Sequence, residues 1–302
     1  MTALLFGILT LALVGPIPEV LARAEWPLYA PRAALTLWQA IALAAVLSAF
    51  STGIAIVTGP IHAGLDDLGA VTWTMSVLVL AGTVVIGLRL IVTVATIGVR
   101  TRHRRRHHRA LIDLLDRAEL RHRADTDLRI LDVPAPLAYC LPGLRSRVVL
   151  SEGVLARLSA DELAAVIEHE RAHLRARHDL VLEAFLALHA AFPRWVRSAA
   201  ALTAVRLLVE ALADDQAVRA TDCTSVGRAL VACADATAPR GAMALGGPTT
   251  ITRLRRLTFQ PAARDLRRVS ATAYALAVAL LVVPTLAVAV PWLTELNRLR
   301  GR

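Results

Sequence analysis

The chain has 302 residues, of which 56% are hydrophobic and only 4% aromatic, and its mean hydropathy is +0.55. Such a surplus of Ala, Leu and Val suits bilayer-spanning helices better than a single water-soluble core. The net charge of +10 rests on arginine without lysine, and three cysteines (Cys140, Cys223, Cys233) at no metal-type spacing argue against a disulfide scaffold.

Four apolar stretches predict transmembrane helices, at about 2–22, 33–57, 71–99 and 271–293. The last three exceed the roughly 20 residues that a helix needs to cross a hydrocarbon core. The first contains "GPIP", which breaks or kinks a helix, so we expect a kinked span there. A cleaved signal peptide is the alternative, because "ARA" at 22–24 resembles a cleavage site, although no arginine precedes the apolar run.

The arginines predict the orientation of these spans. The loop between the second and third spans has no arginine, whereas Arg23, Arg32 and the run "RTRHRRRHHR" at 100–109 lie on the other side. The positive-inside rule therefore puts 101–270 in the cytoplasm of a multi-pass cell-membrane protein and leaves a short tail at 294–302. The arginine run fits contact with anionic lipid headgroups, and we expect no direct nucleic-acid binding.

The segment 101–270 is long enough for a domain of its own. Within it, "LRILDVP" and "SRVVLSEGV" predict short strands, being apolar, β-branched and bounded by Pro, Gly and Ser. "SADE" then offers Ser159 as a helix N-cap with Glu162 three residues later, which is a capping box. A helical pattern follows, and a second helical run covers roughly 198–220.

The first of these helices carries "HERAH", in which His169 and His173 stand four residues apart. Both imidazoles then project from one face, one turn apart, as two ligands of a single Zn²⁺ must. Glu170 lies about 100° around the helix, near enough to serve as the general base without being a ligand. The pattern predicts a metal-dependent hydrolase.

The next helix offers a third ligand. "VEALADDQA" places Glu210 one turn before Asp214 on the same face. A carboxylate that completes a two-histidine site leaves a fourth position open, as a catalytic zinc requires, and Asp214 can accept a ring N–H from a ligand histidine. The alternative is that both are ordinary solvated carboxylates. His178 is off-register for the metal face, and none of the other histidines has a partner at ligand spacing.

Taken together, these residues resemble those of a known group of membrane proteases. The stretch "APLAYCLPGLRSRVVLSEGVLARLSADELAAVIEHERAHLRARHD" with the later "VEALADDQA" resembles the BlaR/MecR-type membrane zinc metallopeptidases. It is more distantly similar to the HtpX/CAAX-protease group. The resemblance implies zinc ligands at His169, His173 and Glu210, a catalytic Glu170 and a supporting Asp214. It implies a mainly α-helical integral membrane protein, with about four transmembrane helices and a gluzincin-type α+β zinc metalloprotease domain containing a small sheet.

The resemblance also implies how substrate binds. In these families the segment before the active-site helix forms an edge strand that holds the substrate backbone, here within 137–150. We therefore expect an edge strand near Arg147, Val148 and Val149. The β-lactam sensors of the family continue into a penicillin-binding domain, for which this sequence has no S-x-x-K motif, so we expect no direct β-lactam sensing.

The predicted function is a zinc-dependent endopeptidase that cleaves protein substrates at the cytoplasmic face. A regulatory role is favoured, such as inactivation of a transcriptional repressor of the BlaI type. An HtpX-like quality-control protease for membrane proteins is the alternative enzyme. A non-catalytic adaptor or sensor that uses zinc only to fold is the alternative of another class, and Glu170 argues against it.

Overall fold

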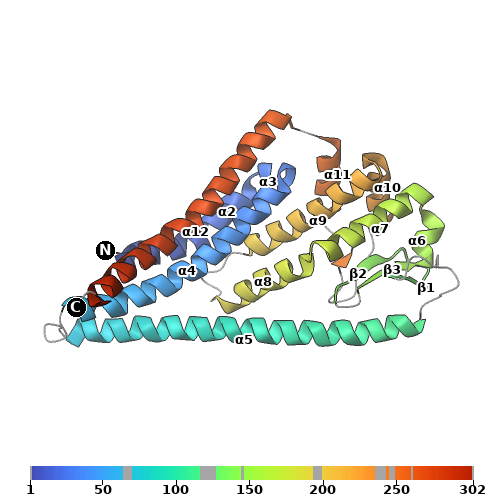
Figure 1. The fold of residues 1–302 in the computed structure, drawn as a ribbon. Helices are drawn as coiled ribbons and strands as arrows, with labels where there is room; N and C mark the ends of the chain where they lie inside the picture. The colour runs from blue at the N-terminus through green and yellow to red at the C-terminus, as the bar shows by residue number, and fades with distance from the viewer. Residues whose placement is uncertain are drawn as a thin grey trace. The chain divides into compact units, whose positions relative to one another are not determined.

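The computed structural model describes residues 2–63, 70–115, 127–143, 146–192, 199–234, 243–244, 249–259 and 261–300. Part of the predicted loop between the second and third spans and the end of the predicted C-terminal tail lie outside these residues. The chain is mostly helical with one small sheet, and it divides into two compact units (Figure 1). Unit 1 comprises Met1–Val94, Phe185–Ala204 and Arg264–Arg302, and unit 2 comprises Ala95–Ala184 and Val205–Ala263.

Unit 1 is built from long apolar helices. Its long helices are α1 (Thr2–Val14), α4 (Pro31–Ala63), the first part of α5 (Ala70–Leu115) and nearly all of α12 (Ala263–Arg300). The short helices α2 (Pro16–Arg23) and α3 (Trp26–Tyr29), the end of α8 (His178–Ala191) and the start of α9 (Ala200–Ala220) complete it. Among the residues that the structure describes, four stretches are long and apolar enough to cross a membrane: Leu4–Arg23, Pro31–Gly53, Trp73–Leu114 and Ala263–Leu286. The break between α1 and α2 falls at Gly15, within the "GPIP" sequence.

Small side chains hold these helices together. Alanines of α4 and α12, such as Ala33, Ala44 and Ala273, pack in one cluster with Leu13 of α1 and leave almost no exposed surface. Small residues let helix backbones approach closely, which is how helices associate where no water drives them together. Large apolar side chains of α5 and α12 are instead exposed, as lipid-facing positions would be.

Unit 2 contains a four-stranded mixed sheet in the order β1-β3-β2-β4. The strands are β1 (Leu128–Leu131), β2 (Ala138–Leu141), β3 (Arg147–Ser151) and the two-residue β4 (Met243–Ala244). β3 pairs in parallel with β1 and antiparallel with β2, and β4 pairs antiparallel with β2. The strands predicted from "LRILDVP" and "SRVVLSEGV" are thus confirmed as β1 and β3.

The sheet is covered on both faces. Val148, Leu150 and Ala138 belong to a core with α7 (Ala160–Arg175) and α10 (Cys223–Ala232), while Val149 and Tyr139 pack with Ile112 of α5. This alternation is the period of two expected of a strand whose two faces are both buried. The remaining helices of unit 2 are α6 (Glu152–Arg157), the first half of α8 (His178–Ala191), most of α9 (Ala200–Ala220) and α11 (Thr250–Thr258).

The predicted edge strand near Arg147, Val148 and Val149 is wrong, because β3 has a neighbour on each side. The edges of the described sheet are β1 and β4. The physical reason is the composition of β3, whose Val148, Val149 and Leu150 are all buried. A strand that is apolar on both faces is stabilised by pairing on both sides, away from solvent.

Candidate metal centre

Helix α7 is fixed at its first turn and buries the predicted site residues along one side. The Ser159 hydroxyl accepts from the backbone N–H of Glu162, whose carboxylate accepts from the N–H of Ser159, so the predicted capping box is confirmed. His169, Glu170 and His173 each have at most 1% of their surface exposed. Burying an imidazole or a carboxylate costs free energy unless the group has a hydrogen-bond or charge partner. The contacts of these three side chains therefore indicate their roles.

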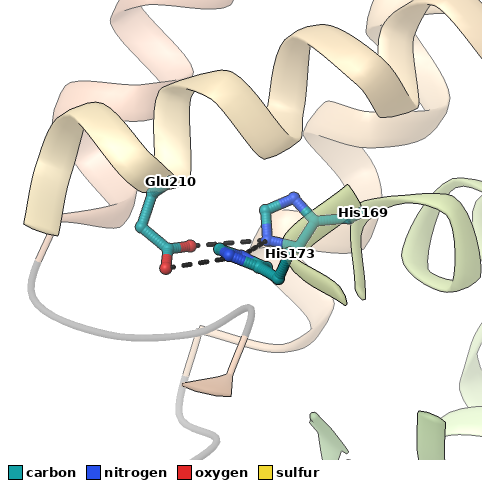
Figure 2. Close-up of side chains that lie close together, drawn as sticks. All are labelled: His169, His173 and Glu210. Carbon is teal, nitrogen blue, oxygen red and sulfur yellow. Dashed lines mark hydrogen bonds and ion pairs between the residues drawn. The ribbon is translucent and has the colours of Figure 1, made fainter. Parts of the chain in front are cut away.

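Three side chains from two helices converge on one point (Figure 2). The Nε2 atoms of His169 and His173, on α7, are 3.1 Å apart. The carboxylate of Glu210, on α9, lies 3.4 Å from His169 Nε2 through Oε2 and 3.6 Å from His173 Nε2 through Oε1. These three residues form a group that could hold a metal ion.

The triangle of donor atoms suits a small tetrahedral ion. Ligand atoms about 2.0–2.2 Å from one such ion stand roughly 3.3–3.5 Å from one another. The separation of the two nitrogens and the distance from each nitrogen to its nearer Glu210 oxygen lie close to that range, and two histidine nitrogens with one carboxylate are a ligand set typical of catalytic zinc. The residues present therefore fit a zinc ion in their chemistry and in their proximity.

Asp214 supports one of the two histidines. It lies one turn after Glu210 on α9, is fully buried, and its Oδ1 is 3.1 Å from His169 Nδ1. A proton on Nδ1 of His169 would face this carboxylate and leave Nε2 free to face the donor triangle. Burial works to lower the pKa of His169, but the bonds to Asp214 and Glu210 outweigh it and raise the pKa to about 9.

Arg253 of α11 joins both acidic members of the site and was not predicted from the sequence. Its side chain is 1% exposed, and its Nη1 is 3.0 Å from Glu210 Oε2. Its Nε donates to Asp214 Oδ2 at 2.8 Å and its Nη2 to Oδ1 at 2.5 Å, a two-pronged contact. Burial raises the pKa values of Glu210 and Asp214, but the Arg253 charge outweighs it and holds both below their usual range.

Glu170 lies beside the donor triangle and outside it. Burial is the main cause that raises the pKa of its carboxyl to about 7, and the repulsion from Glu210 adds to it. A carboxylate whose pKa is close to neutrality can both take and return a proton, which is what a general base and acid must do. Burial also lowers the pKa of His173 to about 3, so that ring is neutral, as a metal ligand must be.

The structure thus brings together all the residues predicted from spacing: His169, His173 and Glu210 at the triangle, with Glu170 and Asp214 beside them. It adds two partners that the spacing did not reveal. One is Arg253. The other is His178, which was predicted to lie off the metal face and whose Nδ1 is 3.0 Å from Nδ1 of His173.

The fold and the donor set define the class of site, a two-histidine and one-carboxylate centre held by two helices beside a small sheet. The comparison with protein families agrees, because residues 101–238 match Peptidase family M48. The match covers less than half of the chain, contains every predicted site residue and ends before Arg253. It supports a metallopeptidase. No curated protein and no solved structure matches the chain significantly.

Proposed function

We propose that this protein is a membrane-bound zinc metalloendopeptidase of the gluzincin type, similar to the BlaR/MecR group, that cleaves protein substrates at the cytoplasmic face of the cell membrane. The observation that carries the proposal is the donor triangle of His169, His173 and Glu210 with Glu170 buried beside it. The match to a peptidase family and the four apolar helices support the two halves of the proposal.

The residues have distinct tasks in peptide hydrolysis. His169, His173 and Glu210 would hold zinc, which supplies a Lewis acid for the peptide carbonyl and lowers the pKa of water. Glu170 takes a proton from the attacking water and returns it to the leaving amine. Asp214 keeps His169 in the tautomer that presents Nε2, and Arg253 balances the two carboxylates.

The direct test is Glu170→Gln in the purified full-length protein. The amide cannot take a proton, so proteolysis of a denatured protein should fall about 10²–10⁴-fold, while zinc stays near one ion per chain. Both are measured on the same sample, by gel assay and by elemental analysis. Full activity in Glu170→Gln would contradict the mechanism.

Glu168→Gln is the matched control for that variant. Glu168 lies on the same helix, two residues earlier, and its carboxylate is paired with Arg175 at 2.9 Å and Arg171 at 3.6 Å, away from the donor triangle. Because the same chemical change is made outside the site, activity should remain close to that of the unmodified protein. Absence of proteolysis in the unmodified protein, together with unfolding on chelation, would favour the zinc-stabilised adaptor.

We propose a regulatory role, such as inactivation of a BlaI-type transcriptional repressor, with HtpX-like quality control as the alternative. The M48 match does not separate the two. The two roles can be distinguished by comparing the protein fragments found in cells with and without the gene. One repressor cut at a single site supports signalling, whereas many cut membrane proteins support quality control.

A further inference from the structure

The two histidines of the donor triangle are supported by different chemistry. Each turns Nε2 toward the triangle, so each turns Nδ1 away from it. Behind His169, Nδ1 meets the Asp214 carboxylate at 3.1 Å, an acceptor with no proton of its own at neutral pH. Behind His173, Nδ1 meets Nδ1 of His178 at 3.0 Å, and two ring nitrogens can share only one proton.

The metal decides which nitrogen carries that proton. A histidine that binds a cation through Nε2 has its proton on Nδ1, so His173 must be the donor in the pair. His178 must then accept through Nδ1 and keep its own proton on Nε2. Its ring is oriented for this, edge-on to His173 with an interplanar angle of 79° and ring centres 5.0 Å apart. His178 is buried, with 4% of its surface exposed.

The turn between α7 and α8 brings the His178 ring next to His173. Five residues along one continuous helix would put it about 140° away from His173. Instead α7 ends at Arg175 and α8 begins at His178, with Arg177 between them in the left-handed region at φ 51°. Non-glycine residues adopt that conformation at a cost, and such residues gather at functional sites. The turn returns His178 to the side of His173.

The first turn of α8 is itself held in place. Arg105, on α5 within unit 2, donates from Nη1 to Asp179 Oδ2 at 2.9 Å. Its Nη2 lies 2.7 Å from Glu183 Oε1, one turn further along α8. Asp179 follows His178 directly and is 3% exposed, so this buried pairing fixes the backbone that carries the His178 ring.

We infer that His178 is a positioning residue of the metal centre, the neutral acceptor that holds His173 in the Nδ1–H tautomer and aims its Nε2 at the ion. This inference rests on the proposed function, because it needs His173 to be a ligand. His178 does for His173 what Asp214 does for His169, without adding another carboxylate to a site whose buried Arg253 already pairs with two.

The test uses two substitutions in the full-length protein. In His178→Asn the amide oxygen can replace Nδ1 as acceptor, whereas His178→Leu has the bulk and no acceptor. Loss of such a partner weakens metal binding about 10–100-fold. We expect that loss in His178→Leu, measured by competition for zinc with a chromogenic chelator, and recovery to within a few-fold in His178→Asn. His189→Leu, a histidine further along α8, should bind zinc normally.

A second measurement does not depend on any variant. ¹⁵N spectra of the zinc-loaded protein with labelled histidine report the tautomer of each ring. We expect a proton on Nδ1 of His173 and on Nε2 of His178. A proton on Nδ1 of His178, or unchanged zinc affinity in His178→Leu, overturns the inference while leaving the proposed function intact. Loss of affinity in His178→Asn as large as that in His178→Leu also overturns it. The proposed function fails separately, if Glu170→Gln remains active.

Discussion

At the scale of single residues, the metal centre contains buried side chains of opposite charge that neutralise one another. Glu210 and Asp214 bring two negative charges to α9, and Arg253 brings one positive charge to meet them. Burying a charge without a partner costs several kcal/mol, so the arginine is as necessary to the carboxylates as they are to it. A bound dication would supply further positive charge on the Glu210 side.

This balance predicts what Arg253→Met should do. In the metal-free protein the two carboxylates lose their partner, and breaking a buried pair costs about 3–5 kcal/mol. Hydrogen exchange in α9 and α11 should therefore become faster in the metal-free variant. Added zinc should restore more protection in Arg253→Met than in the unmodified protein, because the ion replaces part of the lost charge.

Arg256→Met is the control for that experiment. Arg256 lies one turn after Arg253 on α11 and pairs with Asp215, whose side chain is 29% exposed. Water screens a partly exposed pair, so its loss should change exchange in α9 only slightly and should not alter the response to zinc. Equal exchange in Arg253→Met and Arg256→Met would show that the carboxylates do not depend on the buried arginine.

Spacing revealed the part of the site that lies on regular helices and missed the part that does not. His169 and His173, like Glu210 and Asp214, are four apart, and a helix puts such pairs on one face. Arg253 lies 39 residues beyond Asp214, on another helix, next to Arg255 and Arg256, and nothing local distinguishes it from them. His178 was excluded because no Gly or Pro signals the helix break at Arg177.

At the scale of secondary-structure elements, the start of α7 determines where the site residues point. The helix begins at Ala160, and the capping box satisfies backbone donors of its first turn. If the sequence slipped by one residue along a helix fixed in space, His169 and His173 would rotate by about 100° away from α9. The cap therefore contributes to the position of the site as well as to the stability of the helix.

Ser159→Ala should weaken this start. Loss of an N-cap hydroxyl costs about 1 kcal/mol, within a range of 0.5–2 kcal/mol. Hydrogen exchange in the first turn of α7 should then speed up about fivefold, as that energy implies, while Ser159→Asn, with an equally good cap, should stay near the unmodified rate. An unchanged rate in Ser159→Ala would mean that other contacts hold the first turn without the cap.

The sheet was predicted only where the strand pattern is strong. β1 and β3 are apolar and β-branched, and both were found. β2, "AYCL", lacks that composition although all four residues are buried, and β4 has two residues. The place of β3 in the sheet could not be predicted, because it depends on the pairing of β3 with β2, a strand that the sequence pattern did not indicate.

At the scale of the whole molecule, hydropathy located the spans and missed the ends of their helices. The predicted third span ends at 99, yet α5 continues without a break to Leu115. The predicted fourth span begins at 271, yet α12 begins at Ala263. In both cases the additional turns are rich in arginine. Arginine favours the helix, but its low hydropathy ends the apolar stretch from which a span is predicted. A helix can leave the apolar layer and remain a helix.

The last prediction concerns the side of the membrane on which the site works, and it decides which substrates the enzyme can meet. Arg100–Arg109 follows the third apolar stretch, and the positive-inside rule then places unit 2 in the cytoplasm. Paired reporters, one active only in the cytoplasm and one only outside, should give a cytoplasmic signal when fused at Asp132 and an external one at Arg302. A fusion at His62, near the end of α4 and within the arginine-free segment between the predicted second and third spans, serves as the external control.

The alternative gives a different pattern. If "ARA" at 22–24 were cleaved, the new N-terminus would begin outside and the three remaining spans would place unit 2 outside, unless the arginines override that order. The fusion at Asp132 would then report externally and the fusion at His62 internally. Repressors and other cytosolic proteins would be out of reach, and the proposed regulatory role would be lost even with an active zinc centre. A cytoplasmic signal at Asp132 keeps those substrates accessible to Glu170 and its metal.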